Sequence, residues 1–254
     1  MFDPQKFIEE KIIDLKEAIE DNAIIGLSGG VDSTTAAVLV NQAIGKNLKC
    51  ILVDTGYMRK NEIEKNEEML KKFGLNISVF DARQRFYKNL EGVIDPEEKR
   101  KVIGETFIRV FEEEAIKEKA KYLVQGTIAP DWIESGGGLR DTIKSHHNVG
   151  GLPEKFDLEL VEPLRDLYKD EVRVLGEKLG LPKEIYQRQP FPGPGLAIRI
   201  VGEATPERAE TIREACAIVE EDIEKAAEKE EITKPWQYFA VLLSSRAVGV
   251  QGDV

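Results

Sequence analysis

A chain of 254 residues with 41% apolar and 33% charged side chains is long enough for one large domain or two unequal ones. Its net charge of −11 argues against a broad nucleic-acid-binding surface. No apolar run reaches membrane-spanning length, the first residues do not form a signal peptide, and Cys50 and Cys216 have neither zinc nor redox spacing. These observations predict a soluble, cytoplasmic protein that binds neither nucleic acid nor membrane.

The first half of the chain alternates helical and strand patterns. Apolar side chains at helical spacing predict an amphipathic helix over residues 4–21. The apolar run at residues 23–26 predicts a buried strand, and residues 35–44 predict a buried helix that ends at Gly45. Further strands are predicted at residues 50–53, 77–80 and 122–125, and further helices at residues 61–73 and 95–119. This alternation is typical of an α/β fold, an open parallel sheet with helices on both faces.

The second half departs from this alternation. Residues 128–154 are rich in glycine, and a loop of that length in a compact domain is usually functional or disordered. A helix is predicted over residues 169–179. The proline-rich segment 190–195 marks a domain boundary, because neither helices nor strands accept that many prolines. Beyond it we expect a strand at residues 196–201, a helix at 206–228 and a strand at 238–243.

These boundaries predict two domains. Residues 1–189 form the domain with the parallel sheet, and residues 190–254 form a small α+β domain. Two strands and one helix make a thin core in the second domain, so we expect it to need a partner. The simplest partner is a second copy of the same domain, which predicts a homodimer.

The most informative segment is residues 27–34, Leu-Ser-Gly-Gly-Val-Asp-Ser-Thr, between the first strand and a helix. A strand, a glycine turn and a helix direct several N–H groups at one spot at the positive end of the helix dipole, which favours an oxyanion. The segment adds three hydroxyl donors and two glycines that leave room for a phosphate: Ser28, Ser33, Thr34, Gly29 and Gly30. It lacks the lysine of a Walker loop and the spacing of a dinucleotide fingerprint. The alternative is a plain strand-to-helix turn.

Two other strand ends carry polar or glycine residues, at residues 54–56 and 126–131. In an open parallel sheet, ligands bind beyond the carboxyl ends of the strands. We therefore expect these two segments and residues 28–33 to converge on one site.

The sequence Ser-Gly-Gly-Val-Asp-Ser at residues 28–33 resembles the pyrophosphate loop of ATP pyrophosphatases, which cleave ATP between the α- and β-phosphates. Over essentially all 254 residues the chain is similar to the ATP pyrophosphatase subunits of GMP synthetases. The segments that carry this resemblance are residues 28–33, 53–56 with Arg59, 95–104, 126–135, 144–153, 162–173 and 188–199. The Lys-Ser-His-His-Asn and Phe-Pro-Gly-Pro-Gly sequences within them are close to diagnostic of that family.

The resemblance implies that ATP adenylates the C2 oxygen of xanthosine monophosphate (XMP), that pyrophosphate leaves, and that ammonia displaces AMP to give GMP. The ATP-binding residues it implies are Ser28, Gly29, Gly30, Val31, Asp32, Ser33, Thr34, Val53 and Gly126. Asp32 would also be a Mg²⁺ ligand, because Mg²⁺ prefers one or two carboxylates plus phosphate oxygens. Alternatively, Asp32 caps the following helix and Val53 is only a core residue.

The resemblance also assigns residues outside the loop. Arg100 and Asp253 match family positions that contact XMP, and the less favoured alternative for Arg100 is a solvated helix charge near Glu97 and Glu98. Lys144 resembles the family's lid lysine, which would stabilise developing charge on the phosphates.

Acidic and histidine side chains complete the predicted site. Asp131 and Glu134 match family positions near the metal and the nucleotide, and a surface role is the alternative for Glu134. Together with Asp32 and Lys144, Asp131 makes up the predicted catalytic set. The adjacent His146 and His147 have no third ligand for a metal, so we expect them to contact the lid.

Neither cysteine has the setting of a glutaminase nucleophile, so ammonia is expected from a separate glutamine amidotransferase subunit, with free ammonium as the alternative. The chain also ends before the family's C-terminal stretch, and the dimerisation domain is therefore expected to be incomplete. Two rivals keep the chemistry but change the acceptor: NAD synthetase and an adenylating tRNA thiolase. A third is a regulatory module that binds ATP without turnover.

Overall fold

The computed structural model describes residues 2–134, 158–186 and 188–245, and it divides into two compact units. Unit 1 consists of Met1–Val53, Ile63–Phe80 and Arg109–Pro190. Unit 2 consists of Asp54–Glu62, Asp81–Ile108 and Phe191–Val254. The division of the chain into functional domains at residues 189 and 190 stays a prediction.

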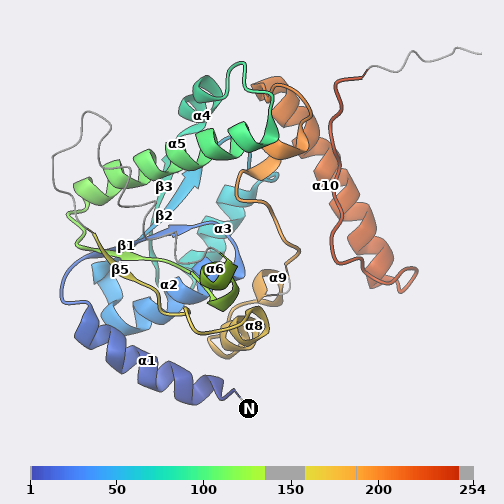
Figure 1. Ribbon diagram of the computed structural model, residues 1–254. Coiled ribbons are helices and arrows are strands. Elements are labelled where there is room, and N and C mark those ends of the chain that lie inside the picture. Colours follow the sequence, from blue (N-terminus) through green and yellow to red (C-terminus); the bar gives the residue numbers. More distant parts are fainter. Residues whose placement is uncertain (1, 135–157, 187, 246–254) are drawn as a thin grey trace, which may run out of the picture. The chain divides into compact units, whose positions relative to one another are not determined.

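The sheet has five strands in the order β3-β2-β1-β4-β5 (Figure 1). The strands are β1 (Ala23–Leu27), β2 (Leu48–Asp54), β3 (Asn76–Asp81), β4 (Tyr122–Val124) and β5 (Glu159–Val161). β1 pairs in parallel with both β2 and β4, and β4 pairs in parallel with β5. The predicted parallel sheet is therefore confirmed. The edge strand β5 was not predicted, because its three residues are too few to show a period.

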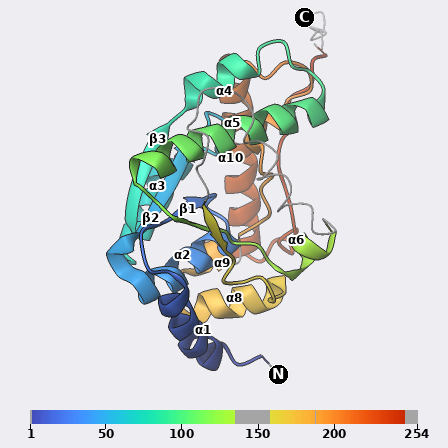
Figure 2. The same cartoon turned by 60° about the vertical axis from the view of Figure 1, so that its left-hand side comes forward.

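Helices α1 (Pro4–Ala18), α2 (Val31–Ile44) and α8 (Lys169–Lys178) pack against one another in unit 1 (Figure 2). At the start of α1, Asp3 accepts hydrogen bonds from the N–H groups of Gln5 and Lys6, both at 3.1 Å. α2 is apolar almost all round and is buried, as the sequence predicts, and Gly45 ends it with a φ of 55°. Among its described residues this unit also contains the 3-10 helix η1 (Gly45–Asn47), α3 (Glu62–Lys71) from Ile63 onward, α6 (Ala129–Glu134), α9 (Lys183–Tyr186) and the part of α5 (Pro96–Lys117) from Arg109 onward.

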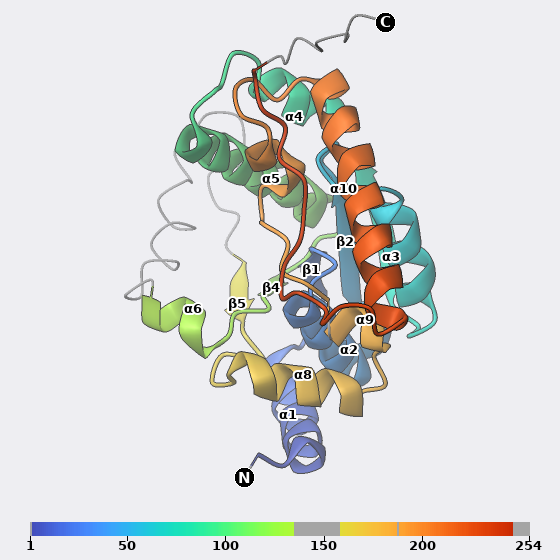
Figure 3. The same cartoon turned by 90° about the vertical axis from the view of Figure 1, so that its right-hand side faces the viewer.

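Unit 2 contains α4 (Arg83–Asn89), the first turns of α5, the 3-10 helix η3 (Gly195–Arg199) and α10 (Pro206–Glu228). The predicted helix over residues 206–228 is confirmed. After α10 the chain turns and runs back along the helix (Figure 3), where Tyr238 donates to Glu224 at 2.8 Å.

The two strands predicted in this unit, at residues 196–201 and 238–243, are wrong. The first segment is mostly η3, and the second contributes only an isolated bridge between Ile200 and Leu242. Apolar runs suggested strands, but Gly195, with a φ of 65°, turns the chain directly after Pro194. Among the described residues, none of the helices combines the length and the apolar character that crossing a membrane requires.

Candidate nucleotide site

The loop between β1 and α2 presents backbone donors, as its sequence predicts. Gly30 is the N-cap of α2, with an extended backbone and no side-chain cap. No described residue accepts a hydrogen bond from the N–H groups of Val31, Asp32 and Ser33 in the first turn. Together with the helix dipole, these three donors make the start of α2 a binding site for an anion.

Two serine hydroxyl groups lie together in this loop. Ser28 Oγ and Ser33 Oγ are 3.1 Å apart, and Ser28 Oγ accepts from the N–H of Gly30 at 3.3 Å. Thr34 differs, because its side chain is fully buried and its hydroxyl group has no hydrogen-bond partner among the described residues. Only the two serines therefore present hydroxyl groups at the loop.

At two positions only glycine fits, because neighbouring atoms lie where a Cβ would be. Gly29 has a φ of 72°, and a Cβ on it would lie 2.4 Å from Nδ2 of the buried Asn66. A Cβ on Gly126, just after β4, would lie 2.8 Å from Ser33 N and 2.9 Å from the carbonyl carbon of Asp32. The end of β4 thus touches the backbone of the loop, which confirms the expected convergence for these two strand ends.

Asp32 lies in the first turn of α2 rather than at its N-cap, so the helix-cap alternative is wrong. Its Oδ2 lies 2.5 Å from Lys169 Nζ at the start of α8. Its Oδ1 is buried and has no hydrogen-bond partner among the described residues. An unpaired carboxylate oxygen beside an anion site suits Mg²⁺, which combines one or two carboxylates with phosphate oxygens. The described residues hold no cluster of three or more His, Cys, Asp or Glu, so phosphate oxygens would supply the other ligands.

Two cationic residues at the loop were not singled out from the sequence. Lys169 pairs with Asp32, and Arg188 donates from Nη1 to the carbonyl of Gly29 at 3.0 Å. Both lie in segments that carry the family resemblance, residues 162–173 and 188–199, and that was the available signal. They bring positive charge to an anion site in a chain whose net charge is −11.

The structure places only some of the other predicted site residues. Val53 is buried, 4% exposed, and follows Leu52, which pairs with Leu27 in the sheet. Asp131 lies in α6 and accepts from the N–H of Ile128 at 3.0 Å, a contact that shapes its own turn. Glu134 ends α6, and its side chain lies outside the described part of the structure. Lys144, His146, His147 and Asp253 also lie outside the described residues.

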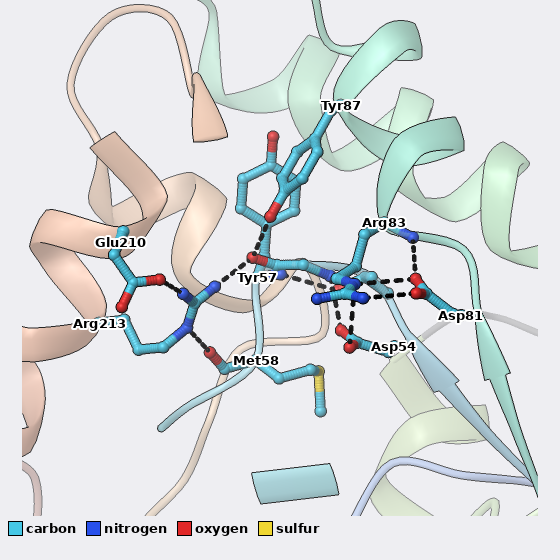
Figure 4. Close-up of polar contacts among 10 residues, drawn as sticks. Asp54, Tyr57, Met58, Asp81, Arg83, Tyr87, Glu210 and Arg213 are labelled. Carbon is cyan, nitrogen blue, oxygen red and sulfur yellow. Dashed lines mark hydrogen bonds and ion pairs between the residues drawn. The ribbon is translucent and has the colours of Figure 1, made fainter. Parts of the chain in front are cut away.

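In unit 2, the loop that follows β2 is tied to α10 (Figure 4). The carbonyl of Gly56 accepts from Arg213 at 2.6 Å and from Tyr87 Oη at 3.2 Å, and Arg213 also donates to the carbonyl of Met58 at 3.1 Å. Gly56 has a φ of 77°, and a Cβ there would lie 2.4 Å from Tyr87 Oη. These hydrogen bonds therefore fix the backbone conformation of the loop after β2.

Carboxylates at the ends of two strands share one arginine in the same view (Figure 4). Arg83 donates to both oxygens of Asp81, at 2.9 and 2.6 Å, and its Nε lies 3.6 Å from Asp54 Oδ2. The hydrogen bonds from Arg83 hold the pKa of the Asp81 carboxyl group below its ordinary value. The Asp81 carboxylate is therefore ionised at neutral pH.

Arg100 lies in the first turns of α5, which begins as predicted with Asp95 accepting from the N–H groups of Glu97 and Glu98 at 2.9 Å. Its guanidinium is exposed and paired with Glu97, as the surface alternative expects. An exposed ion pair contributes little to stability, so a phosphate dianion could replace Glu97 at small cost.

Comparison with known proteins decides the family. The chain is 60% identical over 255 aligned residues to the B subunit of the glutamine-hydrolyzing GMP synthase of Methanopyrus kandleri, covering 100% of this chain and 80% of that protein. The same subunit of Methanocaldococcus jannaschii is 58% identical over 255 residues, with 100% and 80% covered. The chain belongs to the family of GMP synthase B subunits. A GMP synthase of Thermotoga petrophila is 58% identical over 250 residues, which are 97% of this chain and 49% of that protein.

More distant matches agree with the fold of this family. The NAD synthase family model matches residues 3–130. An NMN synthetase from Francisella tularensis has a similar structure, with a TM-score of 0.58 at 16% identity over 77% of this chain and 78% of that one. For an NAD synthetase from Campylobacter jejuni the TM-score is 0.55 at 15% identity, over 91% and 86%. At such identities the likeness concerns the fold alone.

Proposed function

We propose that this chain carries out the synthetase half of GMP formation, in which ATP activates XMP and ammonia converts it to GMP. Membership of the family of GMP synthase B subunits makes the chain a ligase that forms a C–N bond and uses ATP. The observation that carries the proposal is the row of three N–H donors at the start of α2 for which the described residues offer no acceptor, in a chain of that family.

In the first step the C2 oxygen of XMP attacks the α-phosphorus of ATP, and the bond from that phosphorus to the bridging oxygen breaks. Pyrophosphate leaves with the bonding electron pair. The N–H groups at the start of α2, with Ser28 and Ser33, would hold the departing charge in line. Val53 and Gly126, at the ends of the two strands that flank β1, would contact the nucleotide on either side.

Charge on the phosphates needs further compensation. We assign Asp32 as a Mg²⁺ ligand, because its Oδ1 is buried and has no partner in the described part of the chain, with Asp131 and Glu134 as further candidates. A bound Mg²⁺ would neutralise phosphate charge and favour departure of pyrophosphate. Lys169 is paired with Asp32 in this structure, and in this proposal it would donate to a phosphate bound at the loop. Lys144 completes the proposed catalytic set.

In the second step ammonia attacks C2, the bond from C2 to the adenylated oxygen breaks, and AMP leaves; the amine then loses a proton. The relatives are named as one subunit of a larger enzyme, which supports a separate partner, and we propose that this partner is a glutaminase that supplies the ammonia. Arg100 and Asp253 would hold XMP, with the Arg100 fork on its phosphate.

We further propose a homodimer formed through residues 190–254, in the cytoplasm. Large apolar side chains near the end of the described chain are exposed, as expected of a surface that a second copy covers: Trp236, Val241 and Leu243 are 74%, 48% and 58% exposed. Light scattering at micromolar concentration tests the dimer, and a monomeric mass would contradict it.

Deamido-NAD is the second candidate acceptor, because the NAD synthase family model matches residues 3–130. The discriminating experiment measures pyrophosphate release from Mg·ATP with ammonium, comparing XMP, deamido-NAD and no acceptor. Release with XMP alone is the expected result. Pyrophosphate release with deamido-NAD alone would show that deamido-NAD, and not XMP, is the acceptor. ATP binding without pyrophosphate release under any condition would favour a non-catalytic module.

A further inference from the structure

A lysine buried in unit 2 has a role that its sequence does not suggest. Lys99, near the start of α5, is only 1% exposed. Its ammonium group donates to the carbonyls of Ala197 at 3.2 Å, of Ile200 at 2.7 Å and of Gly202. A lysine ammonium has three N–H donors, so every one of them is used, and no carboxylate is among these partners.

The carbonyls belong to one turn, residues 197–204, which other residues anchor as well. Arg208 donates to the carbonyls of Val201 at 2.8 Å and Glu203 at 2.7 Å, and Tyr57 Oη donates to that of Ala204 at 2.6 Å. Carbonyl groups from residue 200 to residue 204 thus accept in succession from two cations and a tyrosine. Glu203 also accepts from the N–H of Gly92, just ahead of α5, at 2.8 Å.

This arrangement joins the turn to the first turns of α5 through Lys99, and to the segment ahead of the helix through Gly92. Successive residues of a helix are about 100° apart around its axis. Because Lys99 points into the turn, Arg100 must point elsewhere, and it is exposed. Lys99 itself has no free N–H and no exposed surface, so it can touch no substrate.

We propose that Lys99 is a positioning residue for the acceptor nucleotide: by holding the 197–204 turn it sets the rotation of α5 and hence the direction of Arg100. The inference rests on the proposed function, in which Arg100 binds the XMP phosphate. The phosphate is remote from C2, so a misdirected Arg100 weakens XMP binding more than it slows the chemical steps.

The test compares Lys99→Met with Lys101→Met, a neighbouring lysine that is exposed on the same helix. Pyrophosphate release with saturating ammonium gives KM for XMP, KM for ATP and kcat. Lys99→Met is expected to raise KM for XMP about tenfold or more and to leave KM for ATP within about twofold. Lys101→Met should leave both KM values unchanged. An unchanged KM for XMP, or an equal rise in both KM values, would overturn the proposal.

A double-mutant cycle separates positioning from a general packing role. In an Arg100→Ala background, Lys99→Met should raise KM for XMP little further, because the group that it positions is gone. A full additional rise would overturn the proposal. Should Lys99→Met not accumulate as folded protein, Lys99→Arg is put through the same cycle, with the same expectation. If the wild-type enzyme releases no pyrophosphate with XMP, the proposed function itself is refuted. That outcome is distinct from a Lys99 variant whose KM for XMP is unchanged.

Discussion

The loop after β1 and the 197–204 turn differ in how far their backbone polar groups are hydrogen-bonded. Three N–H groups of the loop have no acceptor among the described residues, and Asp32 beside them keeps one buried oxygen unpaired. In the turn, successive carbonyls accept hydrogen bonds from Lys99, Arg208 and Tyr57. Buried polar groups in proteins are nearly always hydrogen-bonded. The unpaired set therefore indicates a place for a ligand, and the paired set indicates a framework.

The largest expected effect comes from breaking the contact between β4 and the loop. A Cβ on Gly126 would meet backbone atoms of Asp32 and Ser33 at under 3 Å. Gly126→Ala should therefore move the donors and lower ATP affinity by about a hundredfold, measured by calorimetry. The control is Gly104→Ala in α5, where a Cβ meets nothing within 4 Å. That change should stabilise the protein by about 0.5–1 kcal/mol and leave ATP affinity unchanged. Equal ATP affinities in the two variants would contradict the close approach.

The next effect concerns the unpaired oxygen of Asp32. Asp32→Asn removes the charge but keeps the shape, so we expect the Mg²⁺ concentration for half-maximal turnover to rise about tenfold or more. Asp14→Asn, at an exposed carboxylate of α1, is the matched control. A Mg²⁺ dependence that is the same in both variants would leave Asp32 as only the ion-pair partner of Lys169.

Breaking the framework should affect stability rather than ATP binding. Arg208→Gln removes charge-assisted hydrogen bonds to two carbonyls, and we expect the free energy of unfolding to fall by about 2 kcal/mol in urea. Arg109→Gln, at an exposed arginine of α5, should change it by less than about 0.5 kcal/mol. A loss of ATP affinity in Arg208→Gln, at unchanged stability, would contradict the distinction between site and framework.

The smallest effect appears only at high pH. Burial, reinforced by Tyr87 and Glu203, raises the pKa of Tyr57. The folded state therefore keeps a proton that the unfolded state loses, so the free energy of unfolding should decline as pH rises above about 10. Urea unfolding from pH 9 to 11 measures the decline, which should be shallower in Tyr57→Phe. Equal slopes in the two proteins would show that Tyr57 does not contribute.

Much of unit 1 could be predicted because its signals are local. Apolar runs identified β1, β2, β3 and β4, and the glycine turn before α2 identified the anion site. The strand at residues 196–201 could not be excluded in this way, because its short apolar run suits either a strand or the 3-10 helix that forms. A strand needs a neighbour to pair with, and only Leu242 offers one bridge.

Lys99 shows the limit of sequence reasoning in the same molecule. It stands between Glu98 and Arg100 in a charged run, which predicts a solvated helix face. Its burial depends on carbonyls about 100 residues later in the chain. No local pattern reports such a contact.

The sequence by itself determined the parallel sheet and the anion-binding loop, because periodicity, glycine turns and helix starts act over a few residues. Its motifs gave the resemblance to the family. Only the tertiary structure decided that Asp32 pairs with Lys169 and that Lys99 is enclosed by the 197–204 turn. Both contacts join residues more than 90 positions apart. Whether a charge is solvated or buried depends on which distant backbone folds over it.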